Sequence, residues 1–353
     1  MYSDAQAGPS VPEEVVPFHD AITGVRGAIV LHSTARGPAV GGCRLARYPS
    51  DKDAVADALR LAEGMAWKNA LADLPLGGGK MVLCAAEPLD RTALFRAVGH
   101  AVEALGGRYV TAEDVGTGVA DMDVVAQGTR HVAGRTARPG CAGGDPSPWT
   151  ALGVLNAMRV AVRHRLDAEL SDMTVAVQGL GHVGYALCEL LHEAGARLLV
   201  AEPRSHVAAQ AAVRFGATVV NGTRLSDVHA DVFAPCAMGG VLDAPMVRNL
   251  RAKVVCGAAN NQLFSPFQAE QLADRGILYA PDFLVNAGGI INVTAEHLGW
   301  DESDVRTRID QIGVRLNKTL HDAERFGVTA HEAARRIAVQ RMAANRVTLA
   351  AAA

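Results

Sequence analysis

A glycine-rich turn stands between an expected strand at residues 174–178 and an expected helix at residues 184–194. The turn consists of Gly179, Leu180, Gly181, His182, Val183 and Gly184. Glycines in this setting let backbone N–H groups at a helix N-terminus approach a pyrophosphate, where the unpaired N–H groups and the helix dipole favour an anion. The order of strand, turn and helix therefore predicts a dinucleotide-binding site.

Glu202 ends the next expected strand, 21 residues after Gly181. A carboxylate at this place can accept a hydrogen bond from the adenosine ribose 2'-OH and would repel a 2'-phosphate, which favours NAD over NADP. Arg204 follows two residues later and is a cation that could pair with a phosphate, or a solvated charge on a loop. The choice between the two cofactors stays open at this point.

Polar and glycine-rich segments also follow three later strands of the same half. These segments cover residues 235–240, 257–262 and 281–289 and contain Cys236, Ala237, Asn260 and Asn286. Each one alone reads as a turn, but ligands of such folds lie beyond the carboxyl ends of the strands. Their repetition at successive strand ends favours a nicotinamide and substrate site.

Two lysines and an aspartate in the first half could carry acid–base chemistry. Lys80 follows three glycines before an expected strand at 81–86, and we expect it at the strand mouth, where loss of water makes its amine a useful general base. Lys68 lies in an apolar helix and suits a substrate carboxylate, or snorkels to solvent. Asp114 follows a strand and could relay a proton, or cap the helix that starts near Val119. Gly41 lies in a glycine-rich run that could bring backbone close to a ligand, or form only a turn.

The elements that carry these residues predict an α/β fold with two domains. Helical patterns at 51–73 and 91–105 mix with short apolar runs in the first half, and turn-forming residues between 135 and 149 mark a hinge. From residue 151 a long helix and six short apolar runs alternate with helical patterns, which indicates a doubly wound parallel sheet of Rossmann type. We expect a catalytic domain at 1–145, a dinucleotide-binding domain at 146–330 and a C-terminal helix at 331–353 that packs back toward the first domain.

Composition excludes several other classes of protein. The chain has 353 residues, 49% hydrophobic and 20% charged, and its 34 Lys and Arg nearly balance 37 Asp and Glu for a net charge of −3. We therefore expect a globular protein that binds neither nucleic acid nor a membrane, and a cytoplasmic setting, because the N-terminus lacks the pattern of a secretory signal. The six cysteines and twelve histidines show no zinc-site spacing, so no metal is expected.

Eight segments of this chain resemble the amino acid dehydrogenase family that contains glutamate, leucine, valine and phenylalanine dehydrogenases. They are GPAVGGCR, GMAWK, LPLGGGK, TAEDVG, VQGLGHVG, APCAMGG, GAANNQL and YAPDFLVNAGG. The sequence is more similar to the leucine, valine and phenylalanine branch than to glutamate dehydrogenases. The resemblance implies NAD-dependent, reversible oxidative deamination of an L-amino acid to its 2-oxo acid and ammonia, by a homo-oligomer.

The resemblance also implies a role for each matched residue. Lys80 would be the general base that activates water, and Asp114 would carry protons to and from the amino group. The substrate carboxylate and backbone would be held by Lys68, Gly41, Asn260 and Asn286. The cofactor would be held by the glycine-rich turn, Glu202, Cys236, Ala237, Asn260 and, at the carboxamide, Thr150. Closure between the two domains would expel water during hydride transfer.

The resemblance places four apolar residues around the substrate side chain: Val40, Ala112, Ile290 and Val293. An apolar pocket excludes a glutamate carboxylate, because the buried charge would be unpaired. The Thr-Ala-Glu-Asp run at 111–114 favours a branched aliphatic substrate such as leucine, valine or isoleucine. Asp282-Phe283 and the segment 297–300 look more like the phenylalanine branch, so an aromatic substrate is the alternative.

Two readings from other classes remain at this stage. A sensor that binds NAD without turnover would need neither Lys80 nor Asp114. A hydroxy acid dehydrogenase would be expected to place a His or Arg in the cleft instead of two lysines. Both alternatives therefore fit the residues less well than an amino acid dehydrogenase.

Overall fold

The computed structural model describes residues 11–85, 90–136, 142–222 and 225–351. The chain forms two compact units. The first contains residues 1–144, 296–299 and 338–353, and the second contains residues 145–295 and 300–337. Both units are mixtures of helices and strands, as predicted for an α/β protein.

The first unit is built on a five-stranded mixed sheet with the order β1-β2-β4-β3-β5. Its strands are β1 (Glu14–His19), β2 (Arg26–Ser33), β3 (Ala39–Ala46), β4 (Gly77–Cys84) and β5 (Tyr109–Glu113). Strand β3 runs parallel to both β4 and β5, whereas β2 pairs antiparallel with β1 and β4. Gly41 on β3 and Lys80 on β4 therefore lie on neighbouring strands, and Asp114 directly follows β5, the other neighbour of β3.

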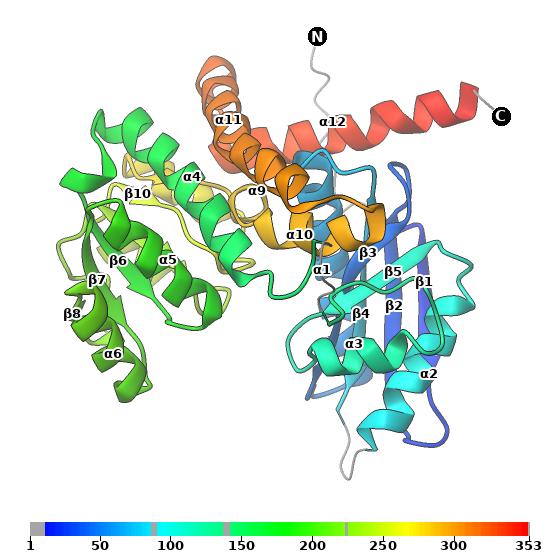
Figure 1. The fold of residues 1–353 in the computed structure, drawn as a ribbon. Helices are drawn as coiled ribbons and strands as arrows, with labels where there is room; N and C mark the ends of the chain where they lie inside the picture. The colour runs from blue at the N-terminus through cyan, green and yellow to red at the C-terminus, as the bar shows by residue number, and fades with distance from the viewer. Residues whose placement is uncertain (1–10, 86–89, 137–141, 223–224, 352–353) are drawn as a thin grey trace. The chain divides into compact units, whose positions relative to one another are not determined.

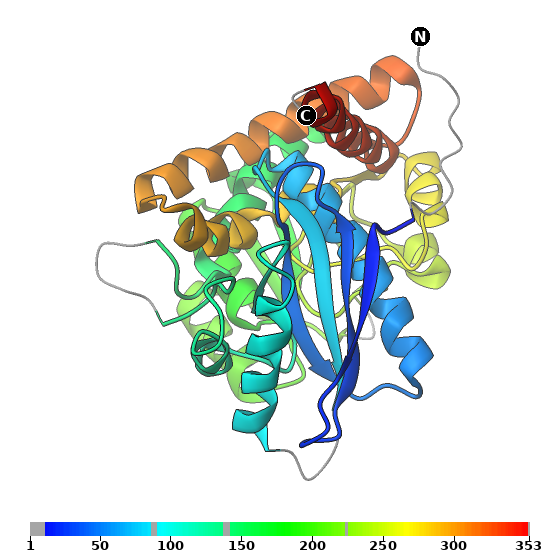
Figure 2. The ribbon, with the colours of Figure 1, turned by 90° about the vertical axis from the view of Figure 1, so that its right-hand side faces the viewer.

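Helices cover both faces of this sheet because side chains alternate along each strand. Val30 and Val82 pack on Ala54, Ala58 and Ala62 of α1 (Asp51–Leu71). On the other face, strand residues such as Ile29 and Met81 share a core with Phe95 of α2 (Arg91–Glu103) and Met122 of α3 (Val119–Val125). Figure 2 shows the blue helix α1 and the cyan helix α2 on opposite sides of the sheet. Lys80 and Arg44, in step with Val82, belong to the α1 face.

The end of α12 (Ala330–Ala351) also belongs to the first unit. Arg341 donates hydrogen bonds of 2.9 Å and 3.0 Å to the backbone oxygens of Ala70 and Leu71, at the C-terminal end of α1. A cation at this place satisfies carbonyls that the helix itself leaves unpaired and complements the helix dipole. The C-terminal helix thus stabilises the end of α1 nearest Lys68.

The second unit contains a six-stranded, fully parallel sheet with the order β11-β10-β9-β6-β7-β8. Its strands are β6 (Thr174–Gln178), β7 (Arg197–Ala201), β8 (Thr218–Val219), β9 (Val232–Pro235), β10 (Val254–Val255) and β11 (Leu278–Tyr279). The order runs outward in both directions from β6, so the predicted doubly wound Rossmann-type fold is confirmed.

Helices join and cover these strands. They are α4 (Ser147–Leu166), a 3-10 turn at Leu170–Asp172, α5 (His182–Glu193), α6 (Ser205–Phe215), α7 (Ala244–Asn249), α8 (Phe267–Asp274), α9 (Asp282–Val285), α10 (Gly288–Leu298) and α11 (Glu302–Phe326). Because each strand of a parallel sheet needs a crossover, most of these helices follow directly from the strand order. Figure 1 shows the strands β6, β7 and β8 together with the helices α5 and α6.

Two predicted boundaries were wrong. The long helix expected from residue 151 already begins at Ser147, within the turn-forming segment 135–149, because proline is tolerated in a first helical turn, where the missing N–H group would be unpaired anyway. Strand β4 begins at Gly77 instead of residue 81, so Lys80 lies inside the strand, opposite Val30, and not at its mouth. Of the predicted hinge, residues 137–141 lie outside the described residues, as do residues 86–89 after β4.

Candidate active site

Lys80 and Asp114 form an ion pair in the first unit. The Lys80 Nζ lies 2.7 Å from Asp114 Oδ2, and the Lys80 side chain is only 6% exposed. A buried lysine needs a charged partner, because burial of an unpaired ammonium is costly. Lys80 is therefore not a surface charge. Asp114 does not cap α3, where the carboxylate of Asp121 accepts instead from the Gly118 N–H at 2.8 Å.

Three glycines bring β4 and its lysine close to the neighbouring elements. A Cβ added at Gly78 would lie 2.1 Å from the Ala66 N of α1, and one at Gly77 would lie 1.9 Å from the Ser33 oxygen. A Cβ at Gly79 would lie 2.9 Å from the ring of Tyr109. Any side chain at these places would push the strand away, so the Gly-Gly-Gly-Lys run is a packing requirement at the site.

Asp114 stays ionised although it is buried. Burial alone would raise the pKa of its carboxyl, but the charges of Lys80 and Arg44 outweigh burial and hold the pKa below its usual value. Its backbone is fixed separately, since the Asp114 N–H donates to the Thr117 hydroxyl at 2.8 Å, and that hydroxyl lies 2.9 Å from the Cys43 carbonyl oxygen. The carboxylate therefore has a defined position beside Lys80.

Four other residues predicted for the site also lie in this unit and differ in their burial and in their distance from the ion pair. Gly41 lies against β4, since a Cβ there would sit 1.7 Å from the Gly79 oxygen and 3.3 Å from the Lys80 N. Lys68 is half-buried on α1, two residues beyond Ala66. Val40 and Ala112 are almost fully buried, on β3 and β5. The structure thus brings Lys80, Asp114 and Gly41 together on neighbouring strands.

In the second unit the glycine-rich turn has the geometry that a pyrophosphate site requires. Gly179 has a φ of +90°, and a Cβ there would lie 2.7 Å from the Ala237 Cβ. A Cβ at Gly184 would lie 2.0 Å from the Gly179 oxygen and 3.2 Å from the Cys236 Cβ. Gly181 is the N-cap of α5 and has open space on its Cβ side. The turn, Cys236 and Ala237 are therefore packed together, with room left at the helix N-terminus.

Glu202 lies beside this turn and is held by Arg204. Its carboxylate accepts from the Leu180 N–H at 2.7 Å and from the Arg204 Nε at 2.7 Å. The hydrogen bond from Arg204 lowers the pKa of Glu202 to about 2, against the opposing effect of burial. Arg204 also donates to the Leu180 oxygen at 3.1 Å. Arg204 is thus a partner of Glu202 and of the turn, with 54% of its side chain exposed to solvent.

The two predicted asparagines contact each other. Asn286 Nδ2 donates to Asn260 Oδ1 at 2.9 Å and to the Ala258 oxygen at 3.1 Å. Its Oδ1 is buried and accepts no hydrogen bond from the described residues. Because a buried unpaired acceptor is costly, this oxygen suits a donor group on a bound ligand.

Helix α10 begins just after this contact and lies tightly against α4. A Cβ at Gly289 would lie 2.5 Å from the Thr150 Oγ1, whose hydroxyl donates to the Pro146 oxygen at 3.0 Å. Val293 is buried and Ile290 partly buried on the same helix. The second unit therefore gathers Thr150 and the start of α10, while Val293 has little surface left for a substrate.

Several residues near the site were missed by the sequence reasoning. Gln262 Nε2 donates to the Gly257 and Ala259 oxygens at 2.8 Å and 3.0 Å, which fixes the loop that carries Asn260. Arg44, within the GPAVGGCR run, contacts Asp114 Oδ2 through its Nε at 2.9 Å. A polar side chain inside an otherwise buried strand was the available signal for Arg44, since such a group requires a partner.

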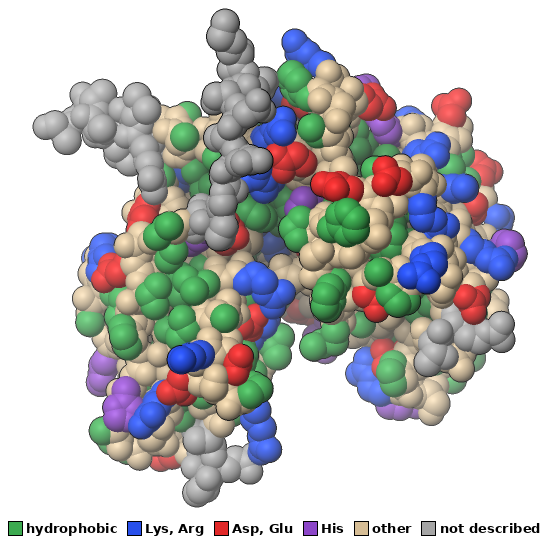
Figure 3. Space-filling model, turned by 180° about the vertical axis from the view of Figure 1, so that it is seen from behind, with side chains coloured by type: hydrophobic (Ala, Val, Ile, Leu, Met, Phe, Trp, Pro, Cys, Tyr) green, Lys and Arg blue, Asp and Glu red, His purple; other side chains and the backbone are tan. Residues whose placement is uncertain are grey.

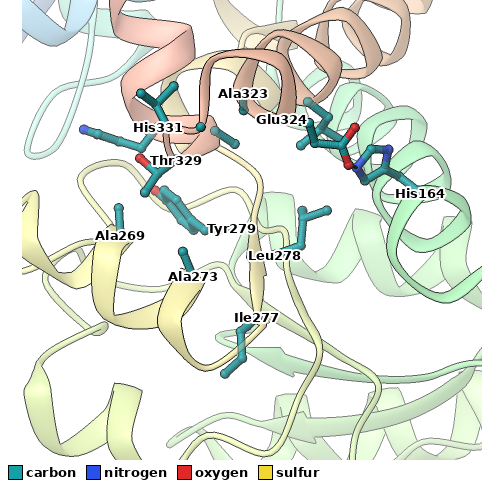
Figure 4. A pocket seen from close by; sticks show the side chains of 14 residues that line it. His164, Ala269, Ala273, Ile277, Leu278, Tyr279, Ala323, Glu324, Thr329 and His331 are labelled. Carbon is teal, nitrogen blue, oxygen red and sulfur yellow. Dashed lines mark ion pairs between the residues drawn. The ribbon is translucent and has the colours of Figure 1, made fainter.

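Described residues of the second unit line at least two hollows. A groove of about 1070 Å³ is lined by residues that include Leu180, Gly181, His182 and Arg204, so it borders the glycine-rich turn. A separate cavity of about 260 Å³ lies beside β11, with the His164–Glu324 ion pair on one side and Tyr279 and His331 on the other (Figure 4). None of the predicted site residues lines this second cavity.

Charges of both signs are mixed on the surface of the described part of the chain. Lys and Arg side chains are interspersed with Asp and Glu on the face shown in Figure 3. Within the described ranges, no three His, Cys, Asp or Glu side chains gather as a metal site, and no helix is long and apolar enough to span a membrane.

Both units match known protein families. Residues 12–131 match the family model described as Glu/Leu/Phe/Val dehydrogenase, dimerisation domain. Residues 145–208 and 199–348 match the model described as Glutamate/Leucine/Phenylalanine/Valine dehydrogenase. Together these matches cover nearly the whole chain.

Individual relatives extend over both units as well. A valine dehydrogenase of Streptomyces coelicolor is 46% identical over 339 residues, which are 95% of this chain and 93% of the relative. A leucine dehydrogenase of Geobacillus stearothermophilus is 43% identical over 332 residues, 94% of this chain and 90% of the relative. The crystal structure of L-tryptophan dehydrogenase from Nostoc punctiforme superposes with a TM-score of 0.82 at 38% identity, over 95% of this chain and 97% of that one.

Proposed function

The chain belongs to the Glu/Leu/Phe/Val dehydrogenase family, and we infer that it catalyses the reversible, NAD-dependent oxidative deamination of a branched-chain L-amino acid to the 2-oxo acid and ammonia. Leucine and valine dehydrogenases are among its relatives at 40–46% identity over at least 94% of the chain. The observation that carries the mechanism is the buried ion pair of Lys80 and Asp114.

Lys80 and Asp114 can divide the proton transfers of this reaction between them. Lys80 can take a proton from the water that attacks the substrate once its ammonium has released a proton to solvent. Asp114, held ionised beside it, can accept a proton from the substrate ammonium and return one to the departing ammonia. Burial of both groups excludes competing water and strengthens their interaction. Lys68 would bind the substrate carboxylate, and the Gly41 backbone would line the site.

The second unit offers the groups that a dinucleotide needs. The N-terminus of α5 with open space at Gly181 suits the pyrophosphate, and Glu202 suits the adenosine ribose. Thr150, Asn260 and Asn286 would lie at the nicotinamide end, together with Cys236 and Ala237 beyond β9. NAD, when bound, supplies the acceptor for the hydride that leaves the substrate Cα. We take residues 1–145 as the catalytic domain and 146–330 as the cofactor domain.

The substrate side chain and the assembly are further parts of the proposal. Val40, Ala112, Ile290 and Val293 are apolar, so a glutamate side chain is disfavoured. An aromatic amino acid is the second candidate, favoured by the L-tryptophan dehydrogenase relative at 40% identity. We propose a homo-oligomer, since the family model over residues 12–131 is described as a dimerisation domain.

NADH formation with a panel of L-amino acids, run beside a Lys80→Ala variant, tests the proposal. Activity with leucine, valine or isoleucine that the variant loses supports the mechanism and the substrate class. A strong preference for phenylalanine or tryptophan keeps the mechanism and overturns the aliphatic pocket. NAD binding without turnover of any amino acid, or failure of ammonium to support 2-oxo acid reduction, contradicts the proposal.

A further inference from the structure

Arg44 joins two carboxylates that lie on different elements of the first unit. Its Nε lies 2.9 Å from Asp114 Oδ2, and its Nη1 lies 3.0 Å from Asp57 Oδ2 on α1. The same Asp114 oxygen lies 2.7 Å from Lys80 Nζ. The Arg44 side chain is 18% exposed, so most of its contacts are made away from bulk water. Two cations from neighbouring strands therefore hold one oxygen of Asp114.

Asp57 is itself held in place by Tyr48, whereas its ion pair with Arg60 lies at the surface and contributes little. The Tyr48 hydroxyl donates to Asp57 Oδ2 at 2.7 Å, and Arg60 donates to Asp57 Oδ1 at 2.7 Å. The Asp57 side chain is 13% exposed, whereas that of Arg60 is 61% exposed. A guanidinium bound by two fixed carboxylates loses its rotational freedom, and its planar fork sets the direction of both contacts. Asp57 is thus the anchor that fixes Arg44.

We propose that Arg44 is a positioning residue that holds the Asp114 carboxylate beside Lys80 in its ionised form, with Asp57 as its anchor. The inference rests on the proposed function, in which Asp114 accepts and returns the proton of the substrate amine. Arg44 does this through Asp114 and needs no contact with substrate. Arg44 is therefore a further residue of the site, beyond the two lysines and the aspartate that bind the substrate and move its protons.

The groups around Asp114 define what the loss of Arg44 would do. They are Lys80 on β4, Arg44 and the Cys43 thiol on β3, and the Tyr109 phenol on β5. Burial raises the pKa of both Cys43 and Tyr109, so both stay neutral near neutral pH and neither adds a charge beside Asp114. Without Arg44, burial of Asp114 is opposed chiefly by Lys80, and the pKa of Asp114 moves upward. Fewer molecules then carry the ionised base at a given acidic pH.

The test compares Arg44→Met with Arg44→Lys and with Arg60→Met. Arg60→Met is the matched control. Arg60 is an exposed arginine that pairs with the same Asp57, and among the described residues it forms no ion pair with Asp114. In amino acid oxidation, we expect Arg44→Met to lose on the order of 10- to 100-fold in kcat/KM, as a small misplacement of a catalytic group does. The acidic limb of the pH profile of kcat/KM should move to higher pH in Arg44→Met. Arg44→Lys should restore part of both, and Arg60→Met should match the parent enzyme.

A second readout separates this inference from the proposed function. The carboxyl carbon of Asp114, labelled with ¹³C and assigned with Asp114→Asn, should titrate at higher pH in Arg44→Met than in the parent protein. This holds whichever substrate the enzyme takes. An unchanged titration in folded Arg44→Met, or an equal shift in Arg60→Met, overturns the inference. A parent enzyme without amino acid oxidation, with the titration shifted as expected, overturns only the proposed function.

Discussion

The hydroxyl of Tyr109 donates a hydrogen bond of 2.7 Å to the carbonyl oxygen of Gly41. Tyr109 is fully buried on β5, and its ring also faces Gly79 on β4. One side chain therefore ties the backbone of Gly41 to the strand that carries Lys80. A buried hydroxyl needs a hydrogen-bond partner, and the Gly41 carbonyl oxygen is that partner. Phenylalanine would fill the same space but could not form this hydrogen bond.

Replacement of Tyr109 by phenylalanine tests that support. We expect Tyr109→Phe to lower the free energy of unfolding by about 1 kcal/mol, since one buried hydrogen bond is lost while the ring packing stays. The activity should fall as well, because the Gly41 backbone is less firmly held. Urea unfolding and steady-state rates measure the two effects. An unchanged unfolding curve would show that the hydrogen bond adds nothing to stability.

The ion pair at the site gives a second prediction. Asp114→Asn keeps the shape of the side chain but removes its charge, so it can neither accept the substrate proton nor pair with Lys80. We expect kcat to fall by about 10² to 10⁴, the range of general acid–base catalysis. Asp123→Asn in the same unit is the control and should retain activity, because the Asp123 carboxylate accepts its hydrogen bonds from Thr136. Comparable activity in both variants would remove Asp114 from the mechanism.

The Glu202–Arg204 contact predicts a pH dependence of stability. Glu202 has a pKa of about 2 in the folded protein, below its ordinary value of 4.5, so folding favours the ionised form. The stabilisation is complete above pH 4.5 and is lost as the pH falls toward 2. Glu202→Gln should therefore lower the melting temperature at pH 6 more than at pH 3, as measured by calorimetry. An equal difference at both pH values would contradict this assignment.

Two glycines of the first unit should respond in opposite ways to alanine. A Cβ at Gly64 in α1 meets nothing within 4 Å, whereas one at Gly78 in β4 would lie 2.1 Å from the Ala66 N. Gly64→Ala should stabilise the protein by about 0.5–1 kcal/mol through helix propensity. Gly78→Ala should destabilise it by several-fold more than this, since backbone must move. Chemical unfolding of both variants measures the two changes in the free energy of unfolding. Stabilisation by Gly78→Ala would show that β4 and α1 leave room for a methyl group, contrary to the structure.

Much of the fold was predictable because its signals are local. A short apolar run marks β6 and a helical period marks α5, and the glycine-rich turn lies between them as expected. Strand boundaries were less accurate. The strand was expected to begin after Lys80, but the three glycines before Lys80 form the start of β4, where α1 and Tyr109 lie too close for side chains. That closeness comes from residues distant in the sequence, which no local pattern contains.

The candidate site was predictable in its residue types more than in their pairings. Lys80 and Asp114 were identified separately, and their ion pair follows from the order of β4, β3 and β5. The contact of Arg204 with Glu202 depends on side-chain directions beyond β7, where a solvated charge was an equally simple reading. Arg44 was missed for the same reason, since its two partners are 13 and 70 residues away.

The hydrogen bonds from Arg341 to the end of α1 bear on how the chain folds during synthesis. The first unit takes in residues 296–299 and 338–353, although its sheet is complete by residue 113. The residues of the second unit, 145–295 and 300–337, are synthesised before Arg341 is free to bind. The first unit therefore begins to fold before the second unit and is completed only after the second unit has been synthesised. Without Arg341, the Leu71 carbonyl loses this donor, while the Ala70 carbonyl keeps the Asp73 N–H.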